Sequence, residues 1–136
     1  MKTMKTTAII ERGKDGTYGI YVADNNLPFG IIGDGKTVAD AKADFQNSLE
    51  EMKAYYESEG KEFPEIEFEY IYDTASFLQQ YAYAFTLAGL ERITGINQRQ
   101  LSHYINGVRK PRTSTIQKIE SRLRSFGNEI SAIRFV

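Results

Sequence analysis

The sequence of 136 residues contains no cysteine and only one histidine, His103. The absence of cysteine excludes a disulfide-stabilised scaffold and a thiol nucleophile. A zinc site would have to be built from carboxylates and that one histidine, without a second soft ligand. We therefore expect no metal site and no cofactor, and a cysteine-free chain of this kind fits the cytoplasm.

Long apolar runs are also missing: none approaches the ~20 residues that a membrane-spanning helix needs. The basic N-terminal stretch 1–5 leads straight into an alternating pattern at Thr6, whereas a signal peptide would continue into an apolar core. We expect no membrane partner. A hydrophobic share of 41% with a charged share of 26% is typical of a globular protein.

Acidic residues are scarce in the second half of the chain. Residues 1–73 contain fifteen acidic and eight basic residues, a net charge of −7. Residues 74–136 contain three acidic and nine basic residues, a net charge of +6. The asymmetry indicates an acidic module over 1–73 and a basic module over 74–136, with different partners. Chance clustering of solvated charges would give the same balance. Sequence motifs therefore have to decide whether the two halves are separate modules.

The first 33 residues have the pattern of three strands. Alternating β-branched and aromatic residues predict strands over 6–11 and 17–23, and the glycine-bounded turn 13–16 between them contains Asp-Gly, which favours a hairpin. A third short strand is predicted over 29–33.

A helix and a returning strand follow. Thr37 is a predicted helix cap, with Asp40 in the capping-box position, and Gly60 is the predicted end. Apolar residues from Val38 to Tyr56 recur every three or four positions and so share one helix face. In the next segment the apolar residues Ile66, Phe68 and Tyr70 alternate with Glu65, Glu67 and Glu69, so one strand face joins the core. The order predicts a small βββαβ domain of the α+β class.

This half resembles the N-terminal domain of HicB antitoxins. The resemblance rests on the hairpin residues 15–18, the Leu-Pro-Phe-Gly loop 27–30 and the helix start 33–41, and it spans about residues 6–71. The loop is looser than the family pattern, and Asp40 replaces the usual glutamate. The resemblance implies a partial ribonuclease-H-like fold without nuclease activity. It also implies a small basic ribonuclease toxin, HicA-like, as the partner held inactive.

An acidic module suits the masking of a cationic surface. We expect the toxin contacts to come from the acidic strand and from the loop, at Glu65, Glu67, Glu69, Leu27 and Phe29. The three glutamates can equally be the solvated face of an edge strand, where charge discourages edge-to-edge pairing.

Helical spacing begins after a hinge at 72–74. Phe77, Leu78, Tyr81 and Phe85 fit one face of a first helix, and Thr86 can cap a second helix that carries Leu87, Leu90 and Ile93. Asn97 can cap a third helix over Gln98–Ile105 that buries Leu101 and Ile105. A fourth helix has Ser114 and Gln117 as its capping box and is expected to bury Ile116, Ile119, Leu123 and Phe126.

The polar side of the third helix carries side chains that can pair with base edges, and a basic stretch around Pro111 can bind phosphates. We expect contacts to double-stranded DNA from Gln98, Arg99, Gln100, Ser102, His103, Arg109, Lys110 and Arg112. An ordinary solvated helix face is the alternative for Arg99 and His103.

The stretch Leu90–Pro111 resembles the helix-turn-helix of Xre (phage repressor) proteins. The turn glycine, the apolar residue after it, Leu101 and the closing Asn-Gly with a basic stretch and proline stand at family spacing, and the resemblance covers about residues 74–127. It implies that the third helix enters the major groove. Glu91 stands where the family usually has alanine, so it must turn outward or the interhelical angle must differ.

The tail 131–136 is predicted to be a short strand that pairs either with the first sheet or across a dimer. The sequence thus predicts an antitoxin-type regulator, a homodimer or higher homo-oligomer, that neutralises a toxin and binds operator DNA. A free-standing helix-turn-helix regulator is the alternative. A magnesium-dependent nuclease using Asp24, Asp34, Asp40 or Asp44 is a third hypothesis; no signature ties those carboxylates together, so we expect binding and no catalytic residues.

Overall fold

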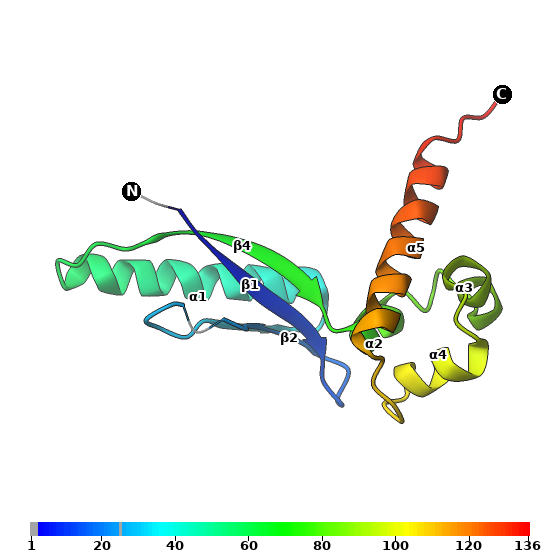
Figure 1. Cartoon of the computed structure of the whole chain (residues 1–136). Coiled ribbons are helices and arrows are strands. Elements are labelled where there is room, and N and C mark those ends of the chain that lie inside the picture. The colour runs from blue at the N-terminus through cyan, green and yellow to red at the C-terminus, as the bar shows by residue number, and fades with distance from the viewer. Residues whose placement is uncertain (1–2, 25) are drawn as a thin grey trace. The chain divides into compact units, whose positions relative to one another are not determined.

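The computed structural model describes residues 3–24 and 26–136. The chain divides into two compact units, Met1–Asp73 and Thr74–Val136, and each is described by itself (Figure 1). The predicted mixture of α and β structure is confirmed. Among the described residues no helix combines the length and the apolar composition that crossing a membrane requires.

The first unit is a four-stranded sheet with one helix on one side (Figure 1). The sheet order is β3-β2-β1-β4; β1, β2 and β3 pair antiparallel, and β4 pairs parallel to β1. A parallel pair needs a crossover connection, which the helix supplies. The elements are β1 (Thr3–Arg12), β2 (Tyr18–Val22), β3 (Ile32–Gly35), α1 (Val38–Ser58) and β4 (Glu65–Tyr72).

The third strand begins later than predicted, at Ile32 instead of Phe29. Pairing starts where Ile32 lies opposite Tyr21 of β2. The ring of Phe29 instead packs between Tyr56 and Phe63, with ring centroids 5.6 Å and 5.3 Å away. Phe29 thus packs against the core of the unit beside the end of α1, outside the strand.

The ends of α1 follow the predicted local chemistry. The hydroxyl of Thr37 accepts a hydrogen bond of 3.0 Å from the backbone N–H of Asp40. At the other end Gly60 follows the cap residue with φ of 66°, a left-handed conformation that glycine adopts without strain.

The core of this unit lies between α1 and the sheet. Phe45 of α1 is fully buried, and its ring meets Phe68 and Tyr70 of β4 edge to face. The other buried members are Ala8, Ile10, Tyr18, Ile20, Ile31, Val38 and Ala41. Gly33 and Gly35 let the helix approach β3 closely, since a Cβ at either position would lie 2.5 Å from helix backbone atoms.

The second unit consists of four helices around one core. They are α2 (Thr74–Gln80), α3 (Leu87–Thr94), α4 (Gln98–Ile105) and α5 (Thr113–Ser131). The buried cluster contains Leu78, Leu90, Ile96, Leu101, Tyr104 and Ile119. Each helix contributes at least one residue to this cluster, so displacing any helix would expose the core to solvent.

The first helix of this unit is shorter than predicted. It ends at Gln80, and turns follow in which the N–H of Ala84 donates to the carbonyl of Tyr81. Phe85 therefore lies outside α2, and its ring contacts Phe126 of α5 at 6.2 Å between centroids.

The last helix starts two residues earlier than predicted, since Ser114 was the expected cap. Arg112 is its N-cap and has no side-chain capping bond, so Ser114 lies inside the first turn. Ile119 is buried as expected, but Ile116 is 37% exposed.

The predicted C-terminal strand is wrong. α5 continues to Ser131, and the N–H groups of Ala132 and Ile133 donate back to helix carbonyls at 3.2 Å and 3.1 Å. These local bonds satisfy backbone groups that an isolated strand would leave without a partner.

We expect Gly33→Ala to lower the free energy of unfolding by about 1–3 kcal/mol. The added Cβ would lie 2.5 Å from the carbonyl oxygen of Ala41 and the amide nitrogen of Phe45, so α1 would have to move. Gly30→Ala is the matched control, because a Cβ there meets nothing within 4 Å. Urea unfolding of the full chain, followed by far-UV circular dichroism, measures both. Equal midpoints for the two variants would contradict the close packing of α1 on β3.

Candidate nucleic-acid interface

The turn between α3 and α4 is fixed by hydrogen bonds of short range. The hydroxyl of Thr86 caps α3 by accepting from the N–H of Gly89 at 2.9 Å. Gly95 ends α3 with φ of 77°. The buried Thr94 donates its hydroxyl to the carbonyl of Leu90 at 2.7 Å and accepts from the N–H of Ile96 at 3.2 Å. The direction in which the chain enters α4 is therefore set by α3.

Two acceptors hold the start of α4. The side-chain oxygen of Asn97 accepts from the N–H of Gln100 at 2.8 Å, as an N-cap residue does. Glu91 of α3 accepts from the N–H of Gln98 at 3.0 Å. Its carboxylate thus faces the positive end of the α4 dipole, which favours a negative group. This contact explains how a glutamate is accommodated at a position where alanine was expected.

One side of α4 is buried in the core of the unit. Leu101 and Tyr104 are 0% and 3% exposed, and Ile105 is half-buried. Tyr104 was not among the predicted core residues; with Leu101 and Ile105 it completes the buried stripe. The side chain of Gln79 from α2 donates to the carbonyl of Ile105 at 2.6 Å and fixes the other end of the helix.

The opposite side of α4 reaches solvent, but its polar residues differ in what they already contact. Gln98 and Arg99 are exposed. Gln100 donates its amide to the hydroxyl of Tyr104 at 2.6 Å, and Ser102 accepts from the amide of Asn106 at 3.2 Å. His103 is half-buried. Gln98 and Arg99 are therefore the two predicted base-reading residues that are most available to a ligand.

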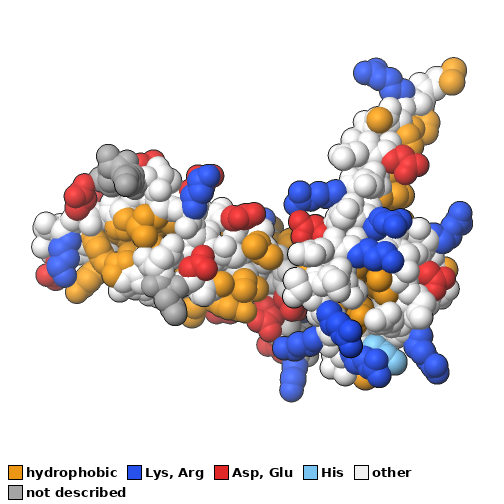
Figure 2. Space-filling model, in the orientation of Figure 1, with side chains coloured by type: hydrophobic (Ala, Val, Ile, Leu, Met, Phe, Trp, Pro, Cys, Tyr) orange, Lys and Arg blue, Asp and Glu red, His pale blue; other side chains and the backbone are white. Residues whose placement is uncertain are grey.

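A basic loop follows α4. Gly107 has φ of 75°, and the N–H groups of Val108 and Arg109 both donate to the carbonyl of His103, at 2.9 Å and 3.3 Å. The predicted phosphate-binding residues Arg109, Lys110 and Arg112 are all exposed. Figure 2 shows lysine and arginine side chains around the histidine of this unit. The surface is cationic next to a polar helix face.

Residues 84–125 match a family model described as helix-turn-helix. This segment is a helix-turn-helix. The match takes in α3, α4 and most of α5, and it supports a DNA-binding transcriptional regulator. No curated protein and no solved structure matches the chain.

The carboxylates considered for a nuclease lie outside the helix-turn-helix, and two of them, Asp24 and Asp44, accept hydrogen bonds within the first unit. Asp24 accepts from the hydroxyl of Thr6 at 3.2 Å and from the N–H of Thr7 at 3.0 Å. Asp44 of α1 accepts from the N–H of Asp34 at 2.8 Å. Over residues 3–24 and 26–136 no three histidine or carboxylate side chains come close enough to hold a metal ion.

The residues predicted to contact a toxin come from two parts of the first unit, the strand β4 and the loop before β3. Glu65, Glu67 and Glu69 are exposed on β4, an edge strand, and point away from the core that Phe68 joins. Leu27 is half-buried, and the ring of Phe29 packs in the aromatic cluster with Tyr56. The ring of Phe29 also stacks on Phe63, at 5.3 Å between centroids, two residues before β4 begins at Glu65.

We expect Asn97→Ala to lower the stability of the helix-turn-helix unit by about 1 kcal/mol, because it removes the capping bond to Gln100. Asn128→Ala, at an exposed position within α5, is the control and should be neutral or slightly stabilising, since alanine favours helix. Thermal unfolding of both variants measures the difference. A loss that is equal in both would show that the side chain of Asn97 has no particular role.

Proposed function

We propose that this chain is a transcriptional regulator that binds operator DNA with α4 in the major groove. The observation that carries the proposal is the seating of α4: the helix is capped at its start, buried along Leu101 and Tyr104, and open along Gln98 and Arg99. Glutamine can pair bidentately with adenine and arginine with guanine, so this exposed pair offers direct readout of sequence.

The basic loop supports the same proposal. Arg109, Lys110 and Arg112 stand immediately after α4 and are exposed. Contacts of such side chains with phosphates position a protein on the duplex, whereas the helix reads the bases. The net charge of +6 over residues 74–136 provides the long-range attraction that such binding uses.

The finer part of the proposal is an antitoxin role for the first unit. We infer that it binds a small basic ribonuclease toxin, HicA-like, and holds it inactive. The resemblance of residues 6–71 to HicB antitoxins, the strand and helix order βββαβ and a net charge of −7 support this role. The βββαβ order also fits a partial ribonuclease-H-like fold. In this proposal the protein acts by binding, and no residue of it is catalytic.

A homodimer is part of the same proposal, because operators of helix-turn-helix proteins are read as two half-sites. Ile130 in the last turn of α5 and Ile133 just beyond its end are 51% and 50% exposed. Apolar side chains that extend from the last turns of a helix favour association with a second copy.

We expect Arg99→Ala to weaken binding to the operator by about 1–3 kcal/mol and to relax the sequence preference at one base pair. Mobility-shift titration with DNA from upstream of the gene measures the affinity. Arg124→Ala is the matched control: it removes the same charge from α5, where Arg124 pairs with Glu120 at 2.8 Å.

The same titration at several salt concentrations tests the loop. The logarithm of the binding constant should fall with that of the salt concentration, with a slope of about −0.9 for each phosphate contacted. A binding constant unaffected by salt, or an equal loss in Arg99→Ala and Arg124→Ala, would contradict the proposed mode of binding.

For the antitoxin role, we expect co-expression of this chain to restore the growth of cells that produce the small basic protein of the adjacent gene. The acidic unit should mask the cationic surface with which a ribonuclease holds RNA. Growth rate and a pull-down with the tagged chain measure the effect. If no small basic protein is encoded nearby or captured, while operator binding persists, the chain is a free-standing regulator.

A further inference from the structure

The side of the sheet opposite α1 carries a row of apolar side chains. Ile9 of β1 pairs with Tyr21 of β2 and with Ile71 of β4, and Tyr21 pairs with Ile32 of β3. The four residues are therefore direct neighbours across all four strands. Because side chains alternate along a strand, they lie on the side away from the buried Ala8, Ile10 and Ile20.

This row is exposed in the described chain. Ile32 is 63%, Ile71 45% and Tyr21 39% exposed, and Ile9 is half-buried. The solvated face of a sheet that is covered on one side normally alternates to polar residues. A contiguous exposed apolar row bordered by polar residues is typical of a binding surface for another protein.

The residues around the row are acidic. Along β1 and β3, the next residues on this sheet face are Glu11 and Asp34, which border the row at one edge. Along β4, Glu69 is the next residue on this face and borders the row at the opposite edge. Among the described strand residues on this side, Lys5 is the only base. Burial, and then the negative charges of Glu11 and Asp73, raise the pKa of Tyr21 above its usual value. The apolar row thus runs through a negative surface.

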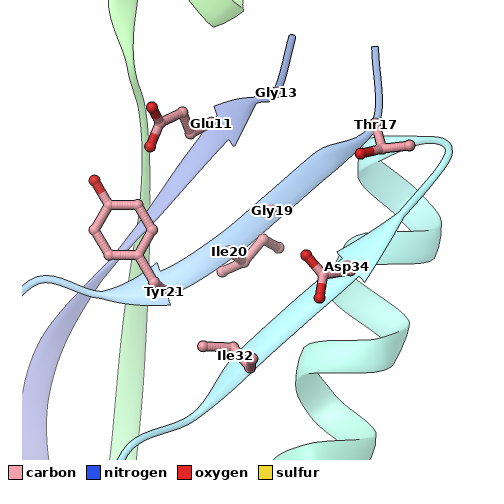
Figure 3. A pocket seen from close by; sticks show the side chains of 8 residues that line it. All are labelled: Glu11, Gly13, Thr17, Gly19, Ile20, Tyr21, Ile32 and Asp34. Atoms are coloured by element: carbon pink, nitrogen blue, oxygen red, sulfur yellow. The ribbon is translucent and has the colours of Figure 1, made fainter. Parts of the chain in front are cut away.

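A hollow of about 290 Å³ opens beside the row at Gly19 (Figure 3). Gly19 pairs with Glu11 on one strand and with Asp34 on the other, so a carboxylate stands on each side of a position without a side chain. Tyr21 and Ile32 supply apolar walls. This combination suits a long cationic side chain, whose stem packs on apolar surface while its head lies between the carboxylates.

We propose that this open sheet face, centred on the hollow at Gly19, is the surface that binds the basic toxin, with an arginine or lysine of the toxin inserted in the hollow. The proposal rests on the antitoxin role inferred above and locates it on Ile9, Tyr21, Ile32 and Ile71. It retains Glu65, Glu67 and Glu69, which lie on the same side, and leaves out Leu27 and Phe29.

Charge decides between this partner and a second copy of the chain. A symmetric dimer through this face would set the same patch against itself. The carboxylates of Glu11, Asp34 and Glu69 would then lie in an interface with one lysine per chain to offset them, and like charges in an interface are unfavourable. A partner with a cationic surface and an apolar centre has no such conflict.

Gly19→Val tests the proposal. The new Cβ would meet only Asp34, at 3.5 Å, which is ordinary contact, and valine favours strands, so the sheet should keep its fold. Filling the hollow should weaken binding of the purified product of the adjacent gene by about tenfold or more, because anchors in central pockets dominate interface energies. Gly30→Val, at a site with nothing within 4 Å, is the control and should bind like the wild type.

Gly19 and Gly30 lie in the first unit, so far-UV circular dichroism and the urea unfolding midpoint of each variant provide the check on folding. Operator affinity, which the second unit supplies, should be unchanged in both variants. If Gly19→Val fails to fold, Ile32→Ser at the most exposed site of the row replaces it, with the same expected loss. Wild-type binding that survives both substitutions would overturn the proposal and leave the antitoxin role standing. Absence of binding by the wild type would overturn the antitoxin role itself. Loss of a wild-type dimer in Gly19→Val, seen by sedimentation, would assign the face to a second copy and overturn the proposal.

Discussion

The burial of Leu101 and Tyr104 on one side of α4 is the contact on which the DNA-binding half depends. Burying these two side chains fixes the rotation of α4 about its own axis. With that rotation fixed, Gln98 and Arg99 face solvent. Thr94, Asn97 and Glu91 then fix where the helix starts. A side chain that reads a base must be positioned to within a fraction of an ångström, and a capped, packed helix supplies that precision.

The two units differ in net charge as well as in secondary structure. The acidic residues of the first unit and the basic residues of the second give net charges of −7 and +6. A polyanion is attracted to one unit and repelled by the other, so each can act on its own kind of partner. In the proposed function the same protein thereby meets a cationic toxin and an anionic duplex without the two surfaces competing for one ligand.

The sheet of the first unit uses its two faces differently. The inner face packs against α1 so closely that only glycine fits at Gly33 and Gly35. The outer face carries an apolar row and a hollow at Gly19, where a side chain would fit. A glycine that the fold does not require, placed between two carboxylates, is the feature of this face that points most directly to a ligand.

The sequence by itself determined most of the elements and three helix caps, because those depend on residues within four positions of one another: Thr37, Thr86 and Asn97 cap the helices that they were expected to cap, whereas Ser114 does not. Local chemistry could not give the end of α2 or the start of β3, since each depends on packing or pairing with distant residues. The tail was predicted wrongly for another reason: its alternating pattern suggested a strand, whereas local bonds continue the helix. The contact of Glu91 with the start of α4 and the row of Ile9, Tyr21, Ile32 and Ile71 were decided by tertiary structure alone. Apolar pairs such as Ile9-Ile10 and Ile31-Ile32 break the alternation visibly in the sequence, but only the register of the strands places the outward members side by side.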